Sequence, residues 1–217
     1  MMYKIIKEPN NEVSFIMYIP NILSKSEINN LQTWLNMNEK FIRDKTKREQ
    51  IWYQENGKYF VKEWYNRYPR WKSNNYDNFL KNFQQKIQTK IGKINLDYPG
   101  IIFPKINSCL INKYKNGNDY IKAHRDTSLS FGTNPTIVGI SVGEEREIKF
   151  TRIKYDEKKL KSLKKDIPNS HLNFSIKLES NSMLIMAGAT QKYFCHEIPN
   201  SEATGKRYSL TFREYLE

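Results

Sequence analysis

Two histidines and one aspartate are the residues of this sequence whose types and spacing most directly suggest chemistry. His124 and Asp126 lie two positions apart, so in an extended backbone both side chains point to one face and can reach one ion. His196 follows in a later segment. Two imidazoles and one carboxylate are the ligand set of non-haem Fe(II) sites that keep coordination positions open. The sequence therefore predicts an iron site at His124, Asp126 and His196.

The histidine–aspartate pair is weak evidence when it is taken alone. Such a pair arises often by chance, and an isolated histidine is more often a structural residue than a ligand. The third histidine, His171, lies in a predicted loop, and we interpret it as structural. The metal hypothesis therefore depends on what other segments contribute to the same site.

A predicted strand near the C-terminal end supplies that support. Residues 207–213 alternate strictly between polar and apolar side chains. An edge strand with a solvated face would show this alternation, and so would the inside of a barrel that binds a dicarboxylate. Arginine suits the second interpretation, because its planar guanidinium binds a carboxylate through two N–H groups. The polar face carries Arg207, Ser209, Thr211 and Arg213.

A second strand could contribute to the same anion site. Residues 108–114 place Asn112 and Tyr114 on one face, shortly before His124 in the chain. An amide and a phenol can both donate hydrogen bonds to a carboxylate. We therefore expect these two side chains beside the arginines of residues 207–213.

The elements that position these residues change character along the chain. Ser24 and Glu27 form a capping box that predicts a helix, and apolar spacing predicts a second helix at 76–94. Short strands are predicted from about residue 105 onward, at 106–114, 136–142, 148–153, 174–178, 183–186 and 208–213. The lysine-rich stretch 154–165 is interpreted as an exposed hairpin insert or loop. Helices followed by many short strands indicate an α+β fold whose C-terminal half is a β-sandwich or jelly roll.

Residues 40–72 combine positive charge with aromatic side chains. The segment holds ten Lys or Arg residues, four acidic residues and nine aromatic residues. Cations contact phosphates and aromatic faces stack on bases, so the segment favours contact with nucleic acid. The alternative is that most of these rings are core residues beneath a solvated basic surface.

Composition limits the classes of protein that the chain can be. The 217 residues carry a formal net charge of +13, which favours a polyanionic partner or reflects a lysine-rich composition alone. Mean hydropathy is −0.76 and no apolar run approaches the roughly 18 residues of a membrane span. Residues 1–7 show no signal-peptide core, and Cys109 and Cys195 are expected to be free thiols. We therefore expect one soluble monomeric domain in a reducing, intracellular compartment, with nucleus or cytoplasm left open.

The combined pattern resembles the AlkB-type Fe(II)/2-oxoglutarate dioxygenases, and its order and spacing are most similar to the animal nuclear DNA-repair members. The strong resemblance covers residues 105–217, and a weaker one is visible at Arg48, Gln50, Tyr53 and Gly57. The family fold is a double-stranded β-helix. The resemblance thus implies one domain over 1–217, with N-terminal helices and a nucleotide-recognition segment in 1–104 and the catalytic β-helix in 105–217.

The resemblance also implies roles for particular residues. His124, Asp126 and His196 would hold Fe(II), Arg207 would pair with the distal carboxylate of 2-oxoglutarate, and Arg213 would lie near its other carboxylate. Asn112, Tyr114 and Thr211 would assist. We predict that 40–72 forms a partly mobile lid, and the residues expected to contact substrate are Arg48, Tyr53, Tyr59, Phe60 and Arg125. Thr127 stands where DNA-repair relatives often carry a further acid.

The implied activity is oxidative demethylation of N-alkylated bases in DNA or RNA, with Fe(II), 2-oxoglutarate and O2 as cofactors and formaldehyde, succinate and CO2 as products. Two alternatives remain open. An oxygenase that acts on protein side chains would share every metal and cosubstrate residue. A non-catalytic nucleic-acid binder could keep the fold, although it would have no physical need for the complete set of ligands and arginines.

Overall fold

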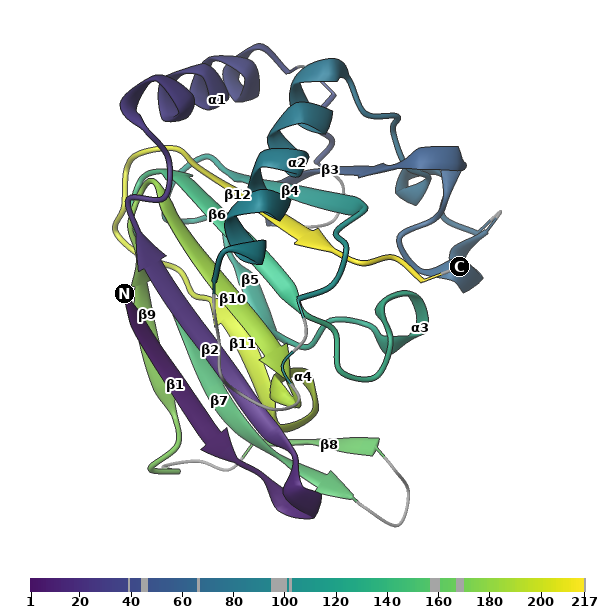
Figure 1. Cartoon of the computed structure of the whole chain (residues 1–217), viewed down its shortest axis with the longest axis vertical. Helices are drawn as coiled ribbons and strands as arrows, with labels where there is room; N and C mark the ends of the chain where they lie inside the picture. The colour runs from purple at the N-terminus through teal and green to yellow at the C-terminus, as the bar shows by residue number, and fades with distance from the viewer. Residues whose placement is uncertain are drawn as a thin grey trace.

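A computed structural model of the chain describes residues 1–38, 40–43, 47–65, 67–94, 101, 103–156, 161–166 and 170–216. Its main element is a seven-stranded antiparallel sheet in the order β1-β2-β10-β6-β12-β4-β3 (Figure 1). In chain order these strands are β1 (Met2–Lys7), β2 (Val13–Pro20), β3 (Glu49–Gln54), β4 (Ser108–Tyr114), β6 (Ile137–Gly143), β10 (Ser182–Gly188) and β12 (Arg207–Arg213).

A second antiparallel sheet lies against the first. Its strands run in the order β5-β11-β7-β8, and β9 also pairs with β7. Their bounds are β5 (Ile121–His124), β7 (Arg146–Asp156), β8 (Lys161–Asp166), β9 (Phe174–Leu178) and β11 (Phe194–Ile198). Two facing antiparallel sheets with few helices confirm the predicted jelly roll. Of the two alternatives for 154–165, a hairpin or a loop, the pairing of β7 with β8 agrees with the hairpin.

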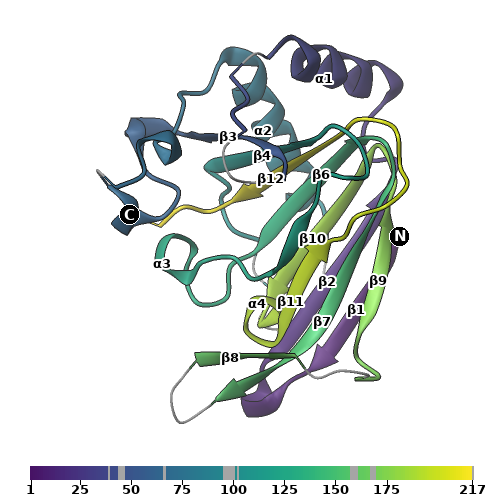
Figure 2. The same cartoon turned by 180° about the vertical axis from the view of Figure 1, so that it is seen from behind.

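Two helices cover the outer face of the larger sheet. They are α1 (Lys25–Met37) and α2 (Asn78–Gly92), and Figures 1 and 2 show both on the same side of the sheet. The predicted capping box is present, because the Ser24 hydroxyl accepts from the Glu27 N–H and the Glu27 carboxylate accepts from the Ser24 N–H. The Trp34 indole donates to Asp77, the N-cap of α2, at 2.8 Å and so joins the two helices. Among the described residues, no helix has the length and apolar character needed to cross a bilayer.

The larger sheet separates two cores because side chains alternate along each strand. One core lies under the helices and includes Leu31, Leu80, Val138, Ile140, Leu210 and Phe212. The other lies between the sheets and includes Ile16, Ile137, Ile148, Phe150, Leu184 and Met186. Strand β12 pairs with β6 on one side and with β4 on the other, so it is a central strand. This central position excludes the solvated edge strand considered above. Because Leu210 and Phe212 pack in the core under the helices, the polar face of β12 points between the sheets.

The N-terminal half differs from the expectation of helices followed by a recognition segment. Strands β1, β2 and β3 all come from the first 104 residues, and they form both edges of the larger sheet. Residue 104 is therefore not a boundary between helices and a β-sheet core. The partners of β2 and β3, which are β10 and β4, are distant in the chain, so no local pattern indicates that these segments pair.

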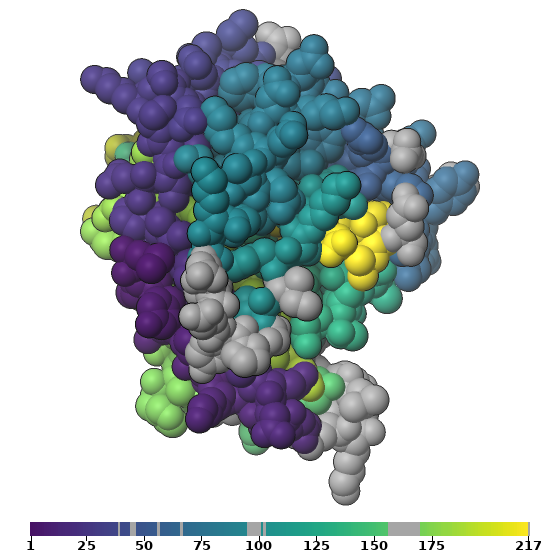
Figure 3. Space-filling model, viewed as in Figure 1, coloured from purple at the N-terminus to yellow at the C-terminus, as the bar shows by residue number. Residues whose placement is uncertain are grey.

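The predicted lid is in part a strand. Residues 49–54 pair with β4 as β3, and the chain then continues through three short 3-10 helices, Glu55–Gly57, Lys62–Trp64 and Pro69–Trp71. Phe60 and Trp71 pack against a small apolar cluster that includes Trp52, Phe131 and Tyr215. In Figure 3 this segment, in blue, lies next to the yellow C-terminal residues. The segment forms a wall beside the space between the sheets, and its mobility stays a prediction.

Candidate active site

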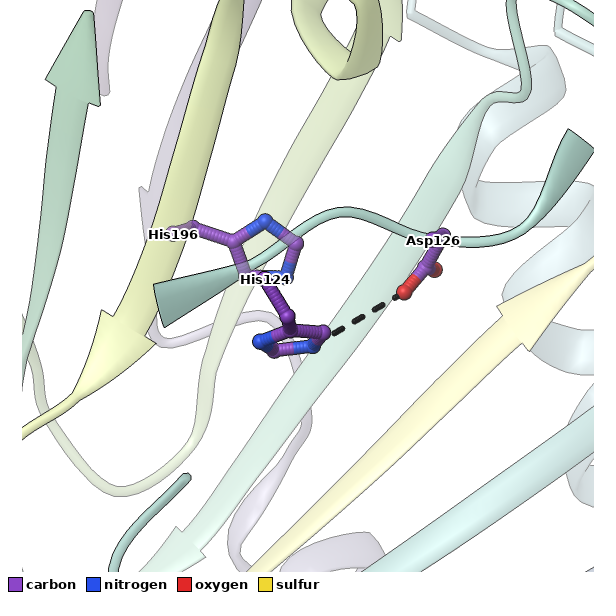
Figure 4. Close-up of side chains that lie close together, drawn as sticks. All are labelled: His124, Asp126 and His196. Carbon is purple, nitrogen blue, oxygen red and sulfur yellow. Dashed lines mark ion pairs between the residues drawn. The ribbon is translucent and has the colours of Figure 1, made fainter. Parts of the chain in front are cut away.

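The three predicted metal ligands come together between the two sheets. His124 ends β5, Asp126 lies in the turn that follows, and His196 lies in the neighbouring strand β11. His196 pairs directly with His124 in the strand register, and their ring centroids are 4.3 Å apart. One ligand atom from each of the three side chains lies within 4.8 Å of the others (Figure 4). This spacing suits three ligands of one metal ion at imidazole and carboxylate bond lengths.

Neighbouring groups orient two of these ligands. The Nδ1 of His124 is 2.9 Å from the Lys122 carbonyl oxygen, which can only accept, so Nδ1 must carry the proton and Nε2 is left for the metal. Arg213 Nε donates to Asp126 Oδ2 at 2.6 Å, and both side chains are 5% exposed. The other carboxylate oxygen, Oδ1, faces His124 Nε2 at 3.9 Å. His124 Nε2 and Asp126 Oδ1 are thus the two atoms of these side chains that are left to bind an ion.

Gln191 fixes the backbone at the metal-ligand residue Asp126. It lies in the short helix α4 (Thr190–Tyr193) and is 4% exposed. Its Oε1 accepts a hydrogen bond from the Asp126 backbone N–H at 2.9 Å, and its amide nitrogen contacts Met186 Sδ at 3.8 Å. The backbone position of Asp126 therefore depends on a side chain that is distant in sequence.

The local electrostatics favour the metal-binding protonation states. Burial, reinforced by the nearby His124, lowers the pKa of His196 to about 3. Burial alone would raise the pKa of Asp126, but the adjacent Arg213 and the two histidines outweigh it and hold that pKa below its usual value. Near neutral pH His196 is thus neutral and Asp126 is ionised, which are the forms that ligate a metal.

A cavity of about 340 Å³ opens beside the ligands. The inward-facing residues of β4, β6 and β12 form one wall, because side chains two apart on a strand share a face. Residues of the smaller sheet, such as Ile148 and Ile198, form the opposite apolar wall. The predicted cosubstrate residues all line this cavity: Asn112, Tyr114, Arg207, Thr211 and Arg213.

Arg207 is the buried cation of this cavity. It is 1% exposed, its Nη2 donates to Ser141 Oγ at 3.0 Å, and its guanidinium lies 5.2 Å from the centre of the Tyr114 ring. Within the described part of the chain, its Nε and Nη1 have no hydrogen-bond partner. Burial lowers the pKa of Arg207, although Tyr114 counteracts this effect. A buried guanidinium with unused donors fits a carboxylate ligand such as 2-oxoglutarate, since an anion would satisfy both its charge and its N–H groups.

The neighbouring polar residues are fixed by hydrogen bonds. Arg213 Nη1 donates to both the carbonyl and the hydroxyl oxygen of Thr211, at 3.0 and 3.1 Å. Asn112 Oδ1 accepts from Arg48 Nε at 2.7 Å and from Gln50 Nε2 at 3.1 Å. An anion that approaches Asn112 would therefore meet its amide nitrogen, which is a donor.

The five predicted substrate residues divide into two groups. Arg48, Phe60 and Arg125 line the cavity. Tyr53 does not, and its predicted contact with a base is wrong. It is 1% exposed, packs in the core under the helices, and accepts a hydrogen bond from Asn38 Nδ2 at 2.7 Å. The same burial raises the pKa of Tyr53 to about 12.

The position of Tyr53 follows from strand alternation. Gln50 and Trp52 point to the cavity side of β3, so the odd-numbered Tyr53 must point to the opposite face. Tyr59 is also absent from the cavity wall, and its ring contacts Tyr65 with centroids 5.6 Å apart. Of the three aromatic residues predicted to contact substrate, Tyr53, Tyr59 and Phe60, only Phe60 lines the cavity.

Several residues of the cavity were not predicted as site residues. Among them are Gln50, Val61, Trp64, Trp71, Ser141 and Ser209. The alternation of residues 207–213 already placed Ser209 beside Arg207, and the same alternation could have identified Ser141 in β6. For Gln191 we find no sequence signal, since a buried glutamine that caps a distant backbone group has no local pattern.

Comparisons with known proteins agree with this geometry. The family model described as the 2OG-Fe(II) oxygenase superfamily matches residues 15–213. The chain is 32% identical over 126 residues to "DNA oxidative demethylase ALKBH2" of Arabidopsis thaliana, which covers 52% of this chain and 38% of that protein. It is 31% identical over 114 residues to human "Alpha-ketoglutarate-dependent dioxygenase alkB homolog 3", which covers 49% and 36% respectively. The matches thus span less than half the length of these curated relatives.

Solved structures support the fold. The structure of OsALKBH1 superimposes with a TM-score of 0.60 at 14% identity and covers 92% of this chain and 97% of that one. A prolyl hydroxylase from Trichoplax adhaerens superimposes with a TM-score of 0.57 at 12% identity and covers 93% and 83%. Identities this low establish a shared architecture, and the substrate must be argued from the cavity.

Proposed function

The chain belongs to the 2OG-Fe(II) oxygenase superfamily, and from that premise we propose that it removes N-alkyl groups from bases in nucleic acid by oxidation. The AlkB-type pattern of the sequence agrees with the curated relatives, which are named as AlkB homologues and DNA oxidative demethylases. Fe(II), 2-oxoglutarate and O2 are the cofactors of this superfamily, as expected. The observation that carries the proposal is the predicted ligand set at the wall of a cavity that also holds the buried Arg207.

Some residues of the chain would bind the iron and 2-oxoglutarate, and others would orient the residues that bind them. When bound, the iron, 2-oxoglutarate and O2 supply the oxidation that converts an N-methyl group into an N-hydroxymethyl group, which leaves as formaldehyde, with succinate and CO2 as the other products. His124, Asp126 and His196 would hold the iron. Arg207 would neutralise one carboxylate of 2-oxoglutarate, with Tyr114 beside it, and Arg213 keeps the Asp126 carboxylate in place.

The cavity walls would protect the reacting groups from water. Apolar residues of both sheets, including Ile137, Ile148, Leu178 and Met186, surround the polar floor. Phe60, Trp64 and Trp71 form an aromatic wall on the side of the segment that follows β3. A flat base that has left its stack could lie against this wall, at an unstacking cost of a few kcal/mol.

Incubation with methylated oligonucleotides tests the proposal. Purified protein with Fe(II) and 2-oxoglutarate should remove a methyl group from defined methylated DNA or RNA oligonucleotides, with stoichiometric succinate and formaldehyde, as measured by mass spectrometry. The His196→Ala variant should lose this turnover while circular dichroism shows a retained fold, because one of three ligands is missing. Succinate production that is stimulated by a peptide, with all methylated oligonucleotides unchanged, would instead favour an oxygenase of protein side chains.

A further inference from the structure

Two tyrosines beside the cavity expose their rings to solvent. Tyr65 is 68% exposed and Tyr68 is 49% exposed. Both lie in the segment between β3 and α2, next to the 3-10 helices Lys62–Trp64 and Pro69–Trp71. Neither ring contributes to the cores under the helices or between the sheets. Burial in either of these cores therefore does not explain the positions of the two rings.

These exposed rings are continuous with the aromatic wall of the cavity. Tyr68 contacts Trp64 edge-on, with ring centroids 5.2 Å apart, and Trp64 contacts Trp71 at 5.4 Å. Trp64 and Trp71 both line the cavity. Tyr65 directly follows Trp64 in the chain and contacts Tyr59 at 5.6 Å. Through Trp64, Tyr68 thus extends the aromatic wall outward from the cavity to the surface, and Tyr65 lies next to this wall in the chain.

Positive charge accompanies the exposed rings. Arg67 lies between the two tyrosines in the chain and is itself exposed. Arg70 places its guanidinium 4.6 Å from the centre of the Trp71 ring. Lys62 belongs to the same segment as the two tyrosines, and its Nζ lies 5.7 Å from the centre of the Tyr215 ring. Exposed aromatic faces interspersed with cations match a nucleic-acid strand, whose bases stack and whose phosphates attract positive charge.

We propose that Tyr65 and Tyr68 stack on the bases that flank the target nucleotide, and that the substrate is therefore single-stranded nucleic acid. This inference rests on the proposed function, since it assumes that the target base enters the neighbouring cavity. Two exposed rings need two accessible base faces. A single strand offers them, whereas in a duplex the flanking bases remain paired and stacked on their own neighbours.

Binding of unmethylated oligonucleotides tests this surface without any demethylation. Fluorescence anisotropy should show tighter binding of the full chain to a single-stranded DNA oligonucleotide than to the duplex of the same sequence. Tyr65→Ala and Tyr68→Ala should each weaken single-strand binding by about five- to 150-fold, the range for loss of one stacked base. Tyr65→Phe and Tyr68→Phe should keep near-normal binding, because stacking needs the ring and not the hydroxyl.

Tyr3 provides a matched control. It is 58% exposed on strand β1, which lies on the opposite side of the molecule from the segment after β3 (Figures 1 and 2). Tyr3→Ala should leave single-strand binding unchanged. If Tyr65→Ala and Tyr68→Ala behave like Tyr3→Ala, the stacking surface is refuted. If the duplex binds more tightly and loses as much affinity in these variants, the rings act as a wedge in double-stranded DNA, and the single-strand assignment is wrong.

The outcome separates this inference from the proposed function. Tyrosine-dependent single-strand binding without demethylation of any methylated oligonucleotide would uphold the surface and contradict the proposed reaction. Demethylation that is equally efficient on single strands and duplexes, and is insensitive to both tyrosine substitutions, would uphold the reaction and overturn the surface.

Discussion

Arg207 combines full burial with positive charge, and this combination is unfavourable unless an anion meets it. Ser141 satisfies only one of its donors, and Tyr114 offers the face of its ring. On the same strand, Arg213 is already paired with Asp126. The two arginines therefore have different tasks, because one has a carboxylate partner within the chain and the other is arranged to receive a carboxylate from a ligand.

Substitution of Arg207 tests this difference. Arg207→Ala should raise the KM for 2-oxoglutarate sharply, since loss of a buried charge pair costs ~2–5 kcal/mol. Arg207→Lys should restore only part of the affinity, because an ammonium group lacks the planar fork. The measurement is succinate production as a function of 2-oxoglutarate concentration. Arg67→Ala, at an exposed position, should leave this KM unchanged, and an unaltered KM in Arg207→Ala would refute the role of Arg207.

Gln191 is predicted to set metal affinity through the backbone of Asp126. Gln191→Ala removes the acceptor for the Asp126 N–H, and loss of such an outer partner typically weakens metal binding by about 10- to 100-fold. Gln191→Glu keeps an acceptor oxygen and should restore much of the affinity. Titration with Co(II), followed by absorption spectroscopy, measures the effect without turnover.

Gln88 provides the control for this substitution. It also accepts a hydrogen bond from a distant backbone group, the Ile106 N–H at 2.8 Å, but it lies on α2 outside the cavity wall. Gln88→Ala should leave Co(II) affinity unchanged. Equal losses in the two alanine variants would mean that Gln191 acts only through general stability.

At the scale of elements, strand pairing places the chemistry. Strands β5 and β11 are adjacent in the smaller sheet, and their register sets His124 opposite His196. Strand β12 lies between β6 and β4, and its two arginines face the cavity that these histidines also line. Helices α1 and α2 contribute no ligand of this site. Their task is to cover the outer face of the larger sheet, and α1 begins with a capping box that stabilises it independently.

The capping box gives a pH-dependent prediction for α1. Hydrogen bonds from Lys86 and from the Ser24 N–H lower the pKa of Glu27 from 4.5 to about 2. The folded state therefore binds this proton less readily than the unfolded state, and the stabilisation is complete above pH 4.5 and lost as the pH falls toward 2. Glu27→Ala should lower the free energy of unfolding by ~1 kcal/mol near neutral pH.

Denaturant titrations at a series of pH values measure this effect. The difference between Glu27→Ala and the unmodified protein should shrink across the acidic range and vanish near the pKa of the folded state. Glu202→Ala, at an exposed glutamate in the loop before β12, should show no such difference. A Glu27 effect that is constant with pH would contradict the electrostatic part of this explanation.

For the whole molecule, the net charge of +13 is the dominant long-range property. Part of this charge is neutralised locally, as where Lys113 and Lys115 both pair with Glu49. Exposed positive charge on the segment after β3 includes Arg67, which lies between Tyr65 and Tyr68 in the chain. Electrostatic attraction of a polyanion should therefore contribute to binding in addition to base stacking.

Salt dependence tests this contribution. Nucleic-acid affinity should fall by ~0.7–0.9 log units per tenfold increase in salt for each phosphate that the protein neutralises. Arg67→Gln should reduce the slope by about one phosphate contact. Lys177→Gln should not, because Lys177 lies on β9, which is far from the segment after β3 in Figure 1, and pairs with Glu145 at 2.7 Å. Affinity that is insensitive to salt would exclude phosphate contacts as a source of binding.

Local patterns in the sequence determined much of this molecule. The capping box and the apolar spacing determined α1 and α2, because helix contacts lie within four residues of one another. Strict alternation determined which side chains of β12 share a face. The types of His124, Asp126 and His196 indicated a metal site once the arginines of 207–213 supported it, since two imidazoles and one carboxylate are an Fe(II) ligand set.

Tertiary structure alone decided how these faces meet. Alternation on β3 separates Gln50 from Tyr53, but only the packing of α1 and α2 shows that the face of Tyr53 is the covered one. The contact of Gln191 with Asp126 joins residues 65 positions apart. Strands β1 and β2 join the larger sheet through β10, near the other end of the chain. Strand register and sheet order are set by pairing between distant segments, and no local window of sequence contains both partners.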